Sequence, residues 1–108
     1  MVHQISPHDL AEQRASGQRV LLVDVRQPLE HQLAALPESL LIPLNDLGHR
    51  SKEIPADGST IIVVYCHHGI RSLSAAAFLE RLGFGNVQSL IGGIDAWSCE
   101  VDPAVPRY

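Results

Sequence analysis

Cys66 stands at the start of a short loop that ends in an arginine, Arg71. The residues between them are His67, His68, Gly69 and Ile70. A cysteine thiolate is a nucleophile, and a nearby guanidinium or helix N-terminus favours the thiolate over the thiol. A guanidinium also presents a planar fork of donors to an oxyanion. These residue types at this spacing predict covalent chemistry on the Cys66 sulfur.

The segments on either side of this loop must hold the cysteine in place. Residues 61–65 form an apolar run rich in β-branched side chains, which is typical of a buried strand. Ser72 begins an alanine-rich segment that predicts a helix ending at Gly83. The first N–H groups of that helix have no partner within it, so they favour an anion at the strand-to-helix junction. Gly69 permits a left-handed turn, and we expect the loop N–H groups to surround the sulfur or its substrate.

The rest of the chain alternates between apolar runs and helical patterns. Strands are predicted at residues 19–26, 40–42 and 87–91, and helices at residues 7–16, 29–36 and 44–53, with a short last helix through Trp97. Such alternation is typical of an α/β fold in which a parallel sheet lies between helices. Ligands of such folds collect at the carboxyl ends of the strands, where Cys66, Asp24 and Arg26 are expected.

Length and composition indicate one domain. The 108 residues, of which 45% are apolar, suffice for a single domain over residues 1–108, with about 102–108 as a C-terminal tail. The formal charge is −4 and no segment clusters basic residues, which argues against nucleic acid or an anionic membrane as a partner. Residues 1–7 do not resemble a signal peptide, and no apolar stretch approaches the roughly 18 residues of a membrane-spanning helix. We expect a cytoplasmic protein with free thiols, and the sequence leaves its oligomeric state open.

Each candidate residue also has a plainer interpretation. A free cysteine is most often a small buried hydrophobe, but the loop and helix after Cys66 favour a functional thiol. Cys99 has no such loop and is interpreted as structural, or as a resolving thiol if it lies near Cys66. A protease-like pair would need a histidine held beside the thiol from elsewhere in the fold. Surface positions are expected for the histidines outside the loop, His3, His8, His31 and His49.

His67 and His68 raise the question of a metal, because imidazole and thiolate are common zinc ligands. Together with Cys66 they are three adjacent residues, which cannot easily turn toward one tetrahedral centre. The sequence has no second cluster of ligands to complete such a site. We therefore expect no metal and no cofactor. The two imidazoles can instead act as hydrogen-bond donors or gain charge in mildly acidic solution.

Three segments of the chain carry a recognisable pattern. They are Leu22-Val23-Asp24-Val25-Arg26, Cys66-His67-His68-Gly69-Ile70-Arg71-Ser72 and Leu90-Ile91-Gly92-Gly93-Ile94-Asp95-Ala96-Trp97. In order and spacing they resemble the signatures of single-domain rhodaneses, a family of sulfurtransferases, and the resemblance covers nearly the whole chain. It implies a rhodanese-like α/β fold with a central, mainly parallel five-stranded sheet and helices on both faces.

The resemblance implies that Cys66 is the catalytic nucleophile of an enzyme of the thiosulfate sulfurtransferase type. It would take a sulfane sulfur from thiosulfate or a persulfide donor, hold it as a persulfide and pass it to cyanide or a thiol. Such covalent catalysis in two half-reactions predicts ping-pong kinetics. Arg71 would help to hold the loop or the sulfite-like leaving group. The groups that bind the substrate and the anionic persulfide would be the N–H groups of His67, His68, Gly69, Ile70 and Arg71.

The same resemblance assigns structural roles, without contact to sulfur, to Asp24 and Arg26 and to the Gly92-Gly93 turn with Trp97. One segment departs from the family pattern. Many relatives carry His-Ile-Pro-Gly-Ala before the third strand, where this chain has Ala35-Leu36-Pro37-Glu38-Ser39. The hydrogen bonding of that turn must therefore differ, and we expect an effect on stability without loss of chemistry.

Two other functions are compatible with the loop. Phosphatases of the cell-cycle type and arsenate reductases resemble this fold, but their loop is one residue longer, whereas residues 66–71 number six, which favours sulfur. The domain could also act as a sulfur carrier that receives or delivers persulfide sulfur through a protein partner. His67 and His68 stand where some relatives place Lys or Arg, so the field for doubly charged thiosulfate is weaker. The sequence leaves the physiological donor and acceptor open.

Overall fold

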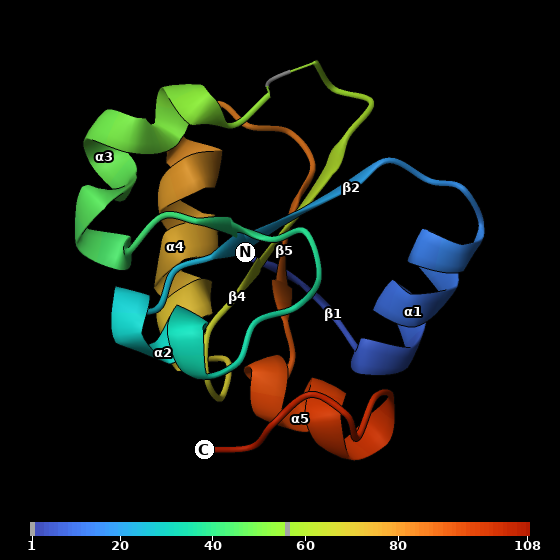
Figure 1. Ribbon diagram of the computed structural model, residues 1–108. Helices are drawn as coiled ribbons and strands as arrows, with labels where there is room; N and C mark the ends of the chain where they lie inside the picture. The colour runs from blue at the N-terminus through green and yellow to red at the C-terminus, as the bar shows by residue number, and fades with distance from the viewer. Residues whose placement is uncertain (1, 56) are drawn as a thin grey trace.

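The computed structural model describes residues 2–55 and 57–108, and its strands form one five-stranded sheet (Figure 1). The strands are β1 (His3–Ile5), β2 (Val20–Asp24), β3 (Leu40–Leu41), β4 (Ile61–Tyr65) and β5 (Val87–Leu90). They lie in the order β1-β5-β4-β2-β3, and every neighbouring pair is parallel. β4 is therefore the central strand, and Cys66 directly follows its carboxyl end.

Helices cover both faces of the sheet, with α3 and α4 on one side and α1 and α5 on the other (Figure 1). The start of α1 follows from its sequence, because Ser6 accepts a hydrogen bond from the Asp9 N–H at 3.1 Å. Among the described residues, no helix is long and apolar enough to cross a membrane. The helices are α1 (Pro7–Ala15), α2 (Pro28–Leu33), α3 (Leu47–Arg50), α4 (Ile70–Arg81) and α5 (Gly93–Glu100), and 3-10 turns at Leu44–Asp46 and Ser51–Glu53 flank α3.

The apolar residues of β4 divide between two cores. Val64 belongs to the cluster that includes Leu79 of α4, and Val63 belongs to the cluster that includes Trp97 of α5. Successive side chains of a strand point to opposite faces, so both faces of this strand are buried, as its uninterrupted apolar run predicts. Burial of each large apolar side chain contributes roughly 1.5–3 kcal/mol, which fixes the strand and hence the position of Cys66.

The α/β class and the parallel sheet expected from the sequence are confirmed. The apolar runs in the sequence predict four of the five strands. They do not predict β1, because Ile5 is its only buried residue. Helix boundaries differ modestly from the expected ones. α4 begins at Ile70 rather than at Ser72, α2 already ends at Leu33, and α5 continues past Trp97.

The segment after α5 returns to the carboxyl end of the sheet. Val105 is 7% exposed and belongs to the same core cluster as Trp97. Ser98 donates a hydrogen bond to the Val105 carbonyl at 2.6 Å, which holds the tail at residues 102–108 against the molecule. The tail thereby brings Tyr108 beside α2, near the loop that precedes α4 (Figure 1).

Candidate active site

The sulfur of Cys66 is buried at the end of β4 and accepts hydrogen bonds from the helix that follows. The Cys66 side chain is almost fully buried. The Gly69 N–H donates to its Sγ at 3.1 Å, and the Ser72 N–H donates to it at 3.4 Å. The Ser72 hydroxyl lies 3.6 Å from Sγ and is itself fixed by the Ser89 hydroxyl at 2.7 Å. The two N–H donors, from Gly69 and Ser72, make this environment suitable for a negatively charged sulfur.

Gly69 gives the loop the shape that brings these N–H groups to the sulfur. Its φ is 97°, a left-handed conformation that favours glycine, and it caps the N-terminus of α4. A Cβ at this position would also lie 3.0 Å from the backbone nitrogen of Gly92. The left-handed turn expected at Gly69 is therefore present. The positive end of the α4 dipole faces the loop.

The first turn of α5 closes the loop from the opposite side. The Ile94 N–H donates to the Cys66 carbonyl at 2.9 Å, and the Asp95 N–H donates to the His67 carbonyl at 3.1 Å. Gly93 permits this approach, because a Cβ there would overlap both carbonyl groups. With these carbonyls held by α5, the loop can turn its N–H groups toward the sulfur.

Arg71 is held by Glu30 of α2. Its NH1 and NH2 groups donate to Oε1 and Oε2 of Glu30 at 2.7 and 2.9 Å. This hydrogen bonding lowers the pKa of Glu30 to about 2 and raises the pKa of Arg71. Glu30 also accepts a hydrogen bond from the Gln27 N–H at 3.1 Å, which fixes it at the start of α2. Arg71 therefore ties the loop to α2 as one half of a neutral pair.

Tyr108 contacts Glu30, Arg26 and His67 beside the Cys66 loop. Its hydroxyl donates to Glu30 Oε2 at 2.8 Å and accepts a hydrogen bond from Arg26 NH1 at 2.7 Å. Its ring stacks on the His67 ring, with centroids 3.9 Å apart and planes inclined by 8°. The His67 ring stacks in turn on the His68 ring at 3.9 Å. The loop and the tail thus form a stack of three rings.

The two loop histidines differ in environment. Burial, followed by the neighbouring His68, lowers the pKa of His67, so its imidazole is neutral in neutral solution. The Nε2 atom of His67 is buried and has no hydrogen-bond partner among the described residues. The His68 side chain is 61% exposed. Within the described part of the chain, neither imidazole forms a hydrogen bond with the Cys66 sulfur.

Arg26 and Asp24 form a buried ion pair at the end of β2, next to α2. Arg26 donates through Nε and NH2 to the two carboxylate oxygens of Asp24 at 2.8 and 2.7 Å, and through NH2 to the Ala34 carbonyl at 2.6 Å. His31 Nδ1 lies 2.7 Å from Asp24 Oδ2, and the His31 side chain is 29% exposed, so this histidine lies at the surface but is partly buried against Asp24. These bonds tie the C-terminal part of α2 to the end of β2, and α2 carries Glu30.

The turn that departs from the family pattern is anchored by Tyr65. The Tyr65 hydroxyl accepts a hydrogen bond from the Leu36 N–H at 3.2 Å and shares another with the Ser39 hydroxyl at 2.8 Å. Burial raises the pKa of Tyr65 to about 12, so its hydroxyl stays protonated. Glu38 has a φ of 61°, in the left-handed region, where the pattern of relatives has glycine. The turn is therefore satisfied by side chains but strained at Glu38.

Within the described part of the chain, Gly69 is the one member of the predicted residues 67–71 that donates a hydrogen bond to the Cys66 sulfur, and the structure adds residues that the sequence did not single out. Cys99 is exposed on α5, whereas Cys66 is buried. The added residues that contact the sulfur or the loop are Ser72, Glu30 and Tyr108. Ser72 is the last residue of the segment Cys66–Ser72, whereas Glu30 and Tyr108 are far from the loop in sequence and reach it only in the folded chain.

Comparisons with known proteins agree with this geometry. Residues 6–100 match the rhodanese-like domain family. The chain is 40% identical over 98 residues to a sulfurtransferase of Allochromatium vinosum, covering 91% of this chain and 90% of that protein. It is 33% identical to the probable adenylyltransferase/sulfurtransferase MoeZ of Mycobacterium tuberculosis over 96% of its own length, but spans only 26% of MoeZ. A crystal structure of a rhodanese-related protein from Thermoplasma volcanium matches with a TM-score of 0.84 at 32% identity, covering 98% of this chain and 99% of that one.

Proposed function

The chain belongs to the rhodanese-like domain family and is a sulfurtransferase of the rhodanese type, and we propose that it transfers a sulfane sulfur through a persulfide on Cys66. The donor is thiosulfate or a persulfide, and the acceptor is cyanide or a thiol. The observation that carries the proposal is that the Cys66 sulfur accepts hydrogen bonds from the N–H groups of Gly69 and Ser72 at 3.1 and 3.4 Å. Such donors stabilise negative charge on a thiolate or a persulfide.

In the first half-reaction, the Cys66 thiolate attacks the sulfane sulfur of the donor. A sulfur–sulfur bond forms to Cys66 while the sulfur–sulfur bond of the donor breaks. The leaving group is sulfite when thiosulfate is the donor, and the thiolate R–S⁻ when the donor is a persulfide R–S–SH. Charge is conserved in both cases. The loop N–H groups of residues 67–71 and the dipole of α4 stabilise the anionic product on Cys66.

In the second half-reaction, the acceptor attacks the outer sulfur of the Cys66 persulfide. The bond between the two sulfurs breaks, and its electron pair returns to Cys66 as the thiolate. Cyanide takes the sulfur and becomes thiocyanate, whereas an acceptor thiolate becomes a new persulfide. The donor product leaves before the acceptor reacts, so the kinetics are ping-pong.

The charges around the loop favour a persulfide donor over thiosulfate. The guanidinium of Arg71 is occupied by both oxygens of Glu30, so the pair is neutral. The imidazole of His67 is neutral as well, because burial lowers its pKa. A dianion such as thiosulfate therefore meets little net positive charge, whereas a persulfide carries at most one negative charge.

Assays with two donors test this function. Turnover is measured with thiosulfate or glutathione persulfide as the donor and cyanide as the acceptor, above the uncatalysed rate. We expect activity with both donors and a higher kcat/KM for the persulfide. Cys66→Ser abolishes turnover, and Cys99→Ser, which removes the exposed thiol, retains it. Full activity in Cys66→Ser would exclude the persulfide mechanism.

A second candidate function, a sulfur carrier that serves a protein partner, is favoured by exposed apolar side chains. Leu29 and Leu33 of α2 are 67% and 53% exposed, and Ile70 of α4 is 76% exposed. They are sequence neighbours of Glu30 and Arg71, which join these two helices beside the loop. Apolar side chains at such a position suit contact with another protein surface. Loading of Cys66 by a cysteine desulfurase, but by neither small donor, would favour the carrier over the enzyme.

A further inference from the structure

We propose that His67, His68 and Asp95 form a binding site for a divalent transition-metal ion of the zinc class at the mouth of the Cys66 loop. This site is separate from sulfur transfer in its chemistry. The sequence argues against a metal because Cys66, His67 and His68 are adjacent in the chain and no second cluster of ligands completes a site. The fold supplies that ligand from the first turn of α5.

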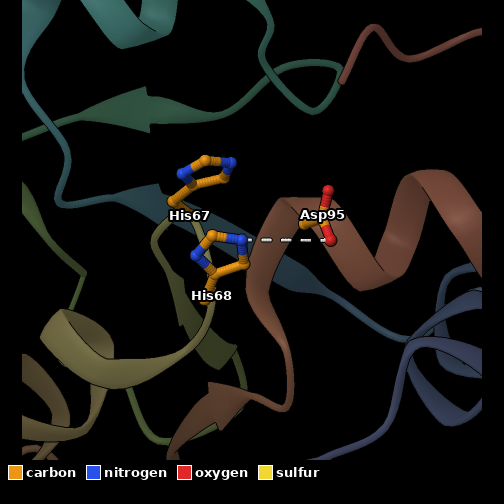
Figure 2. A group of neighbouring side chains, drawn as sticks. All are labelled: His67, His68 and Asp95. Atoms are coloured by element: carbon orange, nitrogen blue, oxygen red, sulfur yellow. Dashed lines mark ion pairs between the residues drawn. The ribbon is translucent and has the colours of Figure 1, made fainter. Parts of the chain in front are cut away.

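The three side chains converge from two elements that are held together by their backbones. One ligand atom of each side chain lies within 4.8 Å of the others. The Nε2 atom of His68 is 4.0 Å from Asp95 Oδ2, and Figure 2 shows both imidazole rings with a nitrogen turned toward the side where Asp95 lies. The Asp95 N–H also donates to the His67 carbonyl at 3.1 Å, so the loop and α5 keep a fixed distance.

The donor set matches the preference of zinc. Two imidazoles and one carboxylate are ordinary ligands for this ion, with metal–ligand distances of about 2.0–2.2 Å. Tetrahedral coordination places ligand atoms about 3.3 Å apart, so the present spacing of up to 4.8 Å must shrink by up to about 1.5 Å. His68 can rotate because its side chain is 61% exposed. His67 gives up no hydrogen bond if it binds the ion through its buried Nε2, which has no partner among the described residues.

The ion pair between Arg107 and Asp95 must give way to the metal. Arg107 donates to the two carboxylate oxygens of Asp95 at 2.9 and 3.3 Å. The Arg107 side chain is 63% exposed, and exposed ion pairs of this kind contribute little to stability. A divalent ion bound by two imidazoles can therefore displace the guanidinium into solvent.

Three protein ligands leave the fourth position of a tetrahedral ion open for water or another small ligand. The ion would link the loop residues His67 and His68 to Asp95 at the start of α5. Cys66 lies one residue before this pair and is almost fully buried. Metal binding is therefore expected to slow the access of reagents to Cys66.

Calorimetric titration with Zn²⁺ tests the site. The full chain carries Cys66→Ser and Cys99→Ser, so that no thiol can bind the ion, and it is freed of metal with a chelator beforehand. We expect one site, weakened about tenfold or more by His68→Asn or by Asp95→Asn. Arg107→Ala is expected to tighten it, because the competing guanidinium is gone. Circular dichroism checks that each variant is folded.

His8→Asn is the matched control for this titration, because His8 lies 3.7 Å from the Glu100 carboxylate on the surface and belongs to no group of three metal-ligating side chains among the described residues. It is expected to bind Zn²⁺ as tightly as the parent chain. Absence of binding to the parent chain, equal affinity in His68→Asn, or equal loss in His8→Asn would overturn the proposal.

A second measurement does not depend on heats of binding. The alkylation rate of Cys66 by iodoacetamide is followed in Cys99→Ser with and without Zn²⁺. We expect Zn²⁺ to slow alkylation, and His68→Asn in the same background to remove most of this protection. Unchanged protection in His68→Asn would place the ion on the thiol itself and overturn the site. Neither measurement requires sulfur transfer, so failure of the proposed function leaves this test intact.

Discussion

Arg71 and Glu30 form an ion pair beside the Cys66 loop. Both guanidinium NH groups of Arg71 point at the Glu30 carboxylate, at 2.7 and 2.9 Å, rather than being free for an incoming anion. The sulfur of Cys66 instead depends on uncharged donors, the N–H groups of Gly69 and Ser72. At the scale of single residues, the donors to the Cys66 sulfur are uncharged, and the Arg71–Glu30 pair beside the loop carries no net charge.

Removing the negative charge of Glu30 should improve the use of thiosulfate. Glu30→Gln keeps the shape of the side chain but leaves Arg71 with an uncompensated positive charge near the loop. We expect the KM for thiosulfate to fall severalfold, with a smaller change for glutathione persulfide, because the dianion gains more from the added field. Steady-state kinetics with both donors at low salt check this. A higher KM for thiosulfate would contradict the role given to Glu30.

The same substitution should lower stability in a pH-dependent way. Hydrogen bonding from Arg71 lowers the folded-state pKa of Glu30 from 4.5 to about 2. Because that pKa is lowered by folding, the contribution of the carboxylate is complete above about pH 4.5 and is lost as the pH falls toward about 2. Arg71 is 37% exposed and screened by solvent, so we expect Glu30→Gln to cost about 1 kcal/mol in neutral solution.

Urea unfolding of the wild type and of Glu30→Gln across this pH range measures the effect. The difference in unfolding free energy between the two proteins should shrink as the pH falls below about 4.5. A difference that is constant with pH would mean that the ion pair does not stabilise the fold.

Tyr108 offers a way to separate hydrogen bonding from ring stacking. Tyr108→Phe removes the hydroxyl that joins Arg26 and Glu30 but keeps the ring on His67, and Tyr108→Ala removes both. We expect the first change to cost about 0.5–1.5 kcal/mol of stability. Only the second should speed hydrogen exchange of the amides of residues 67–71. Equal exchange rates in the two variants would show that the stack does not order the loop.

At the scale of elements, local patterns explain what could be predicted from the sequence. The run before Cys66 and the alanine-rich helix after it are strong short-range signals, and the structure places β4 and α4 there. β1 lacks such a signal, because only one of its three residues is buried. The contact of Glu30 with Arg71 joins residues 41 positions apart, and the contact of Tyr108 with Arg26 spans 82. No local periodicity reports on contacts of that kind.

The turn between α2 and β3 gives a prediction at this scale. Glu38 is held at a φ of 61°, which strains a residue with a Cβ but not a glycine. Glu38→Gly should therefore raise the free energy of unfolding by about 0.5–1 kcal/mol, after the added entropy of the unfolded chain is subtracted. Sulfur transfer should not change.

Glu38→Ala is the matched control for this turn, because it removes the same carboxylate but keeps the Cβ. It should give no gain in urea unfolding at neutral pH. An equal gain in both variants would attribute the effect to charge rather than to backbone strain.

At the scale of the whole molecule, the parallel sheet gathers the site at one edge. The carboxyl ends of β2, β4 and β5 lie side by side, and each leads into a segment that holds the loop. β2 leads to α2 with Glu30, β4 leads to Cys66, and β5 leads to the Gly93 turn. The tail after α5 adds a fourth support through Tyr108. The motifs fix the first three in order along the chain, but the closure by the tail becomes visible only in the folded molecule.

The claim on which this account depends is that Cys66 carries the transferred sulfur. Intact-protein mass spectrometry under non-reducing conditions tests it most directly, after treatment with glutathione persulfide or thiosulfate and removal of excess donor. We predict a mass gain of one sulfur atom, located on the peptide with Cys66 and lost on addition of cyanide with release of thiocyanate. Cys99→Ser should show the same gain and Cys66→Ser none. Turnover without any added sulfur on Cys66, or loading that persists in Cys66→Ser, would contradict the account.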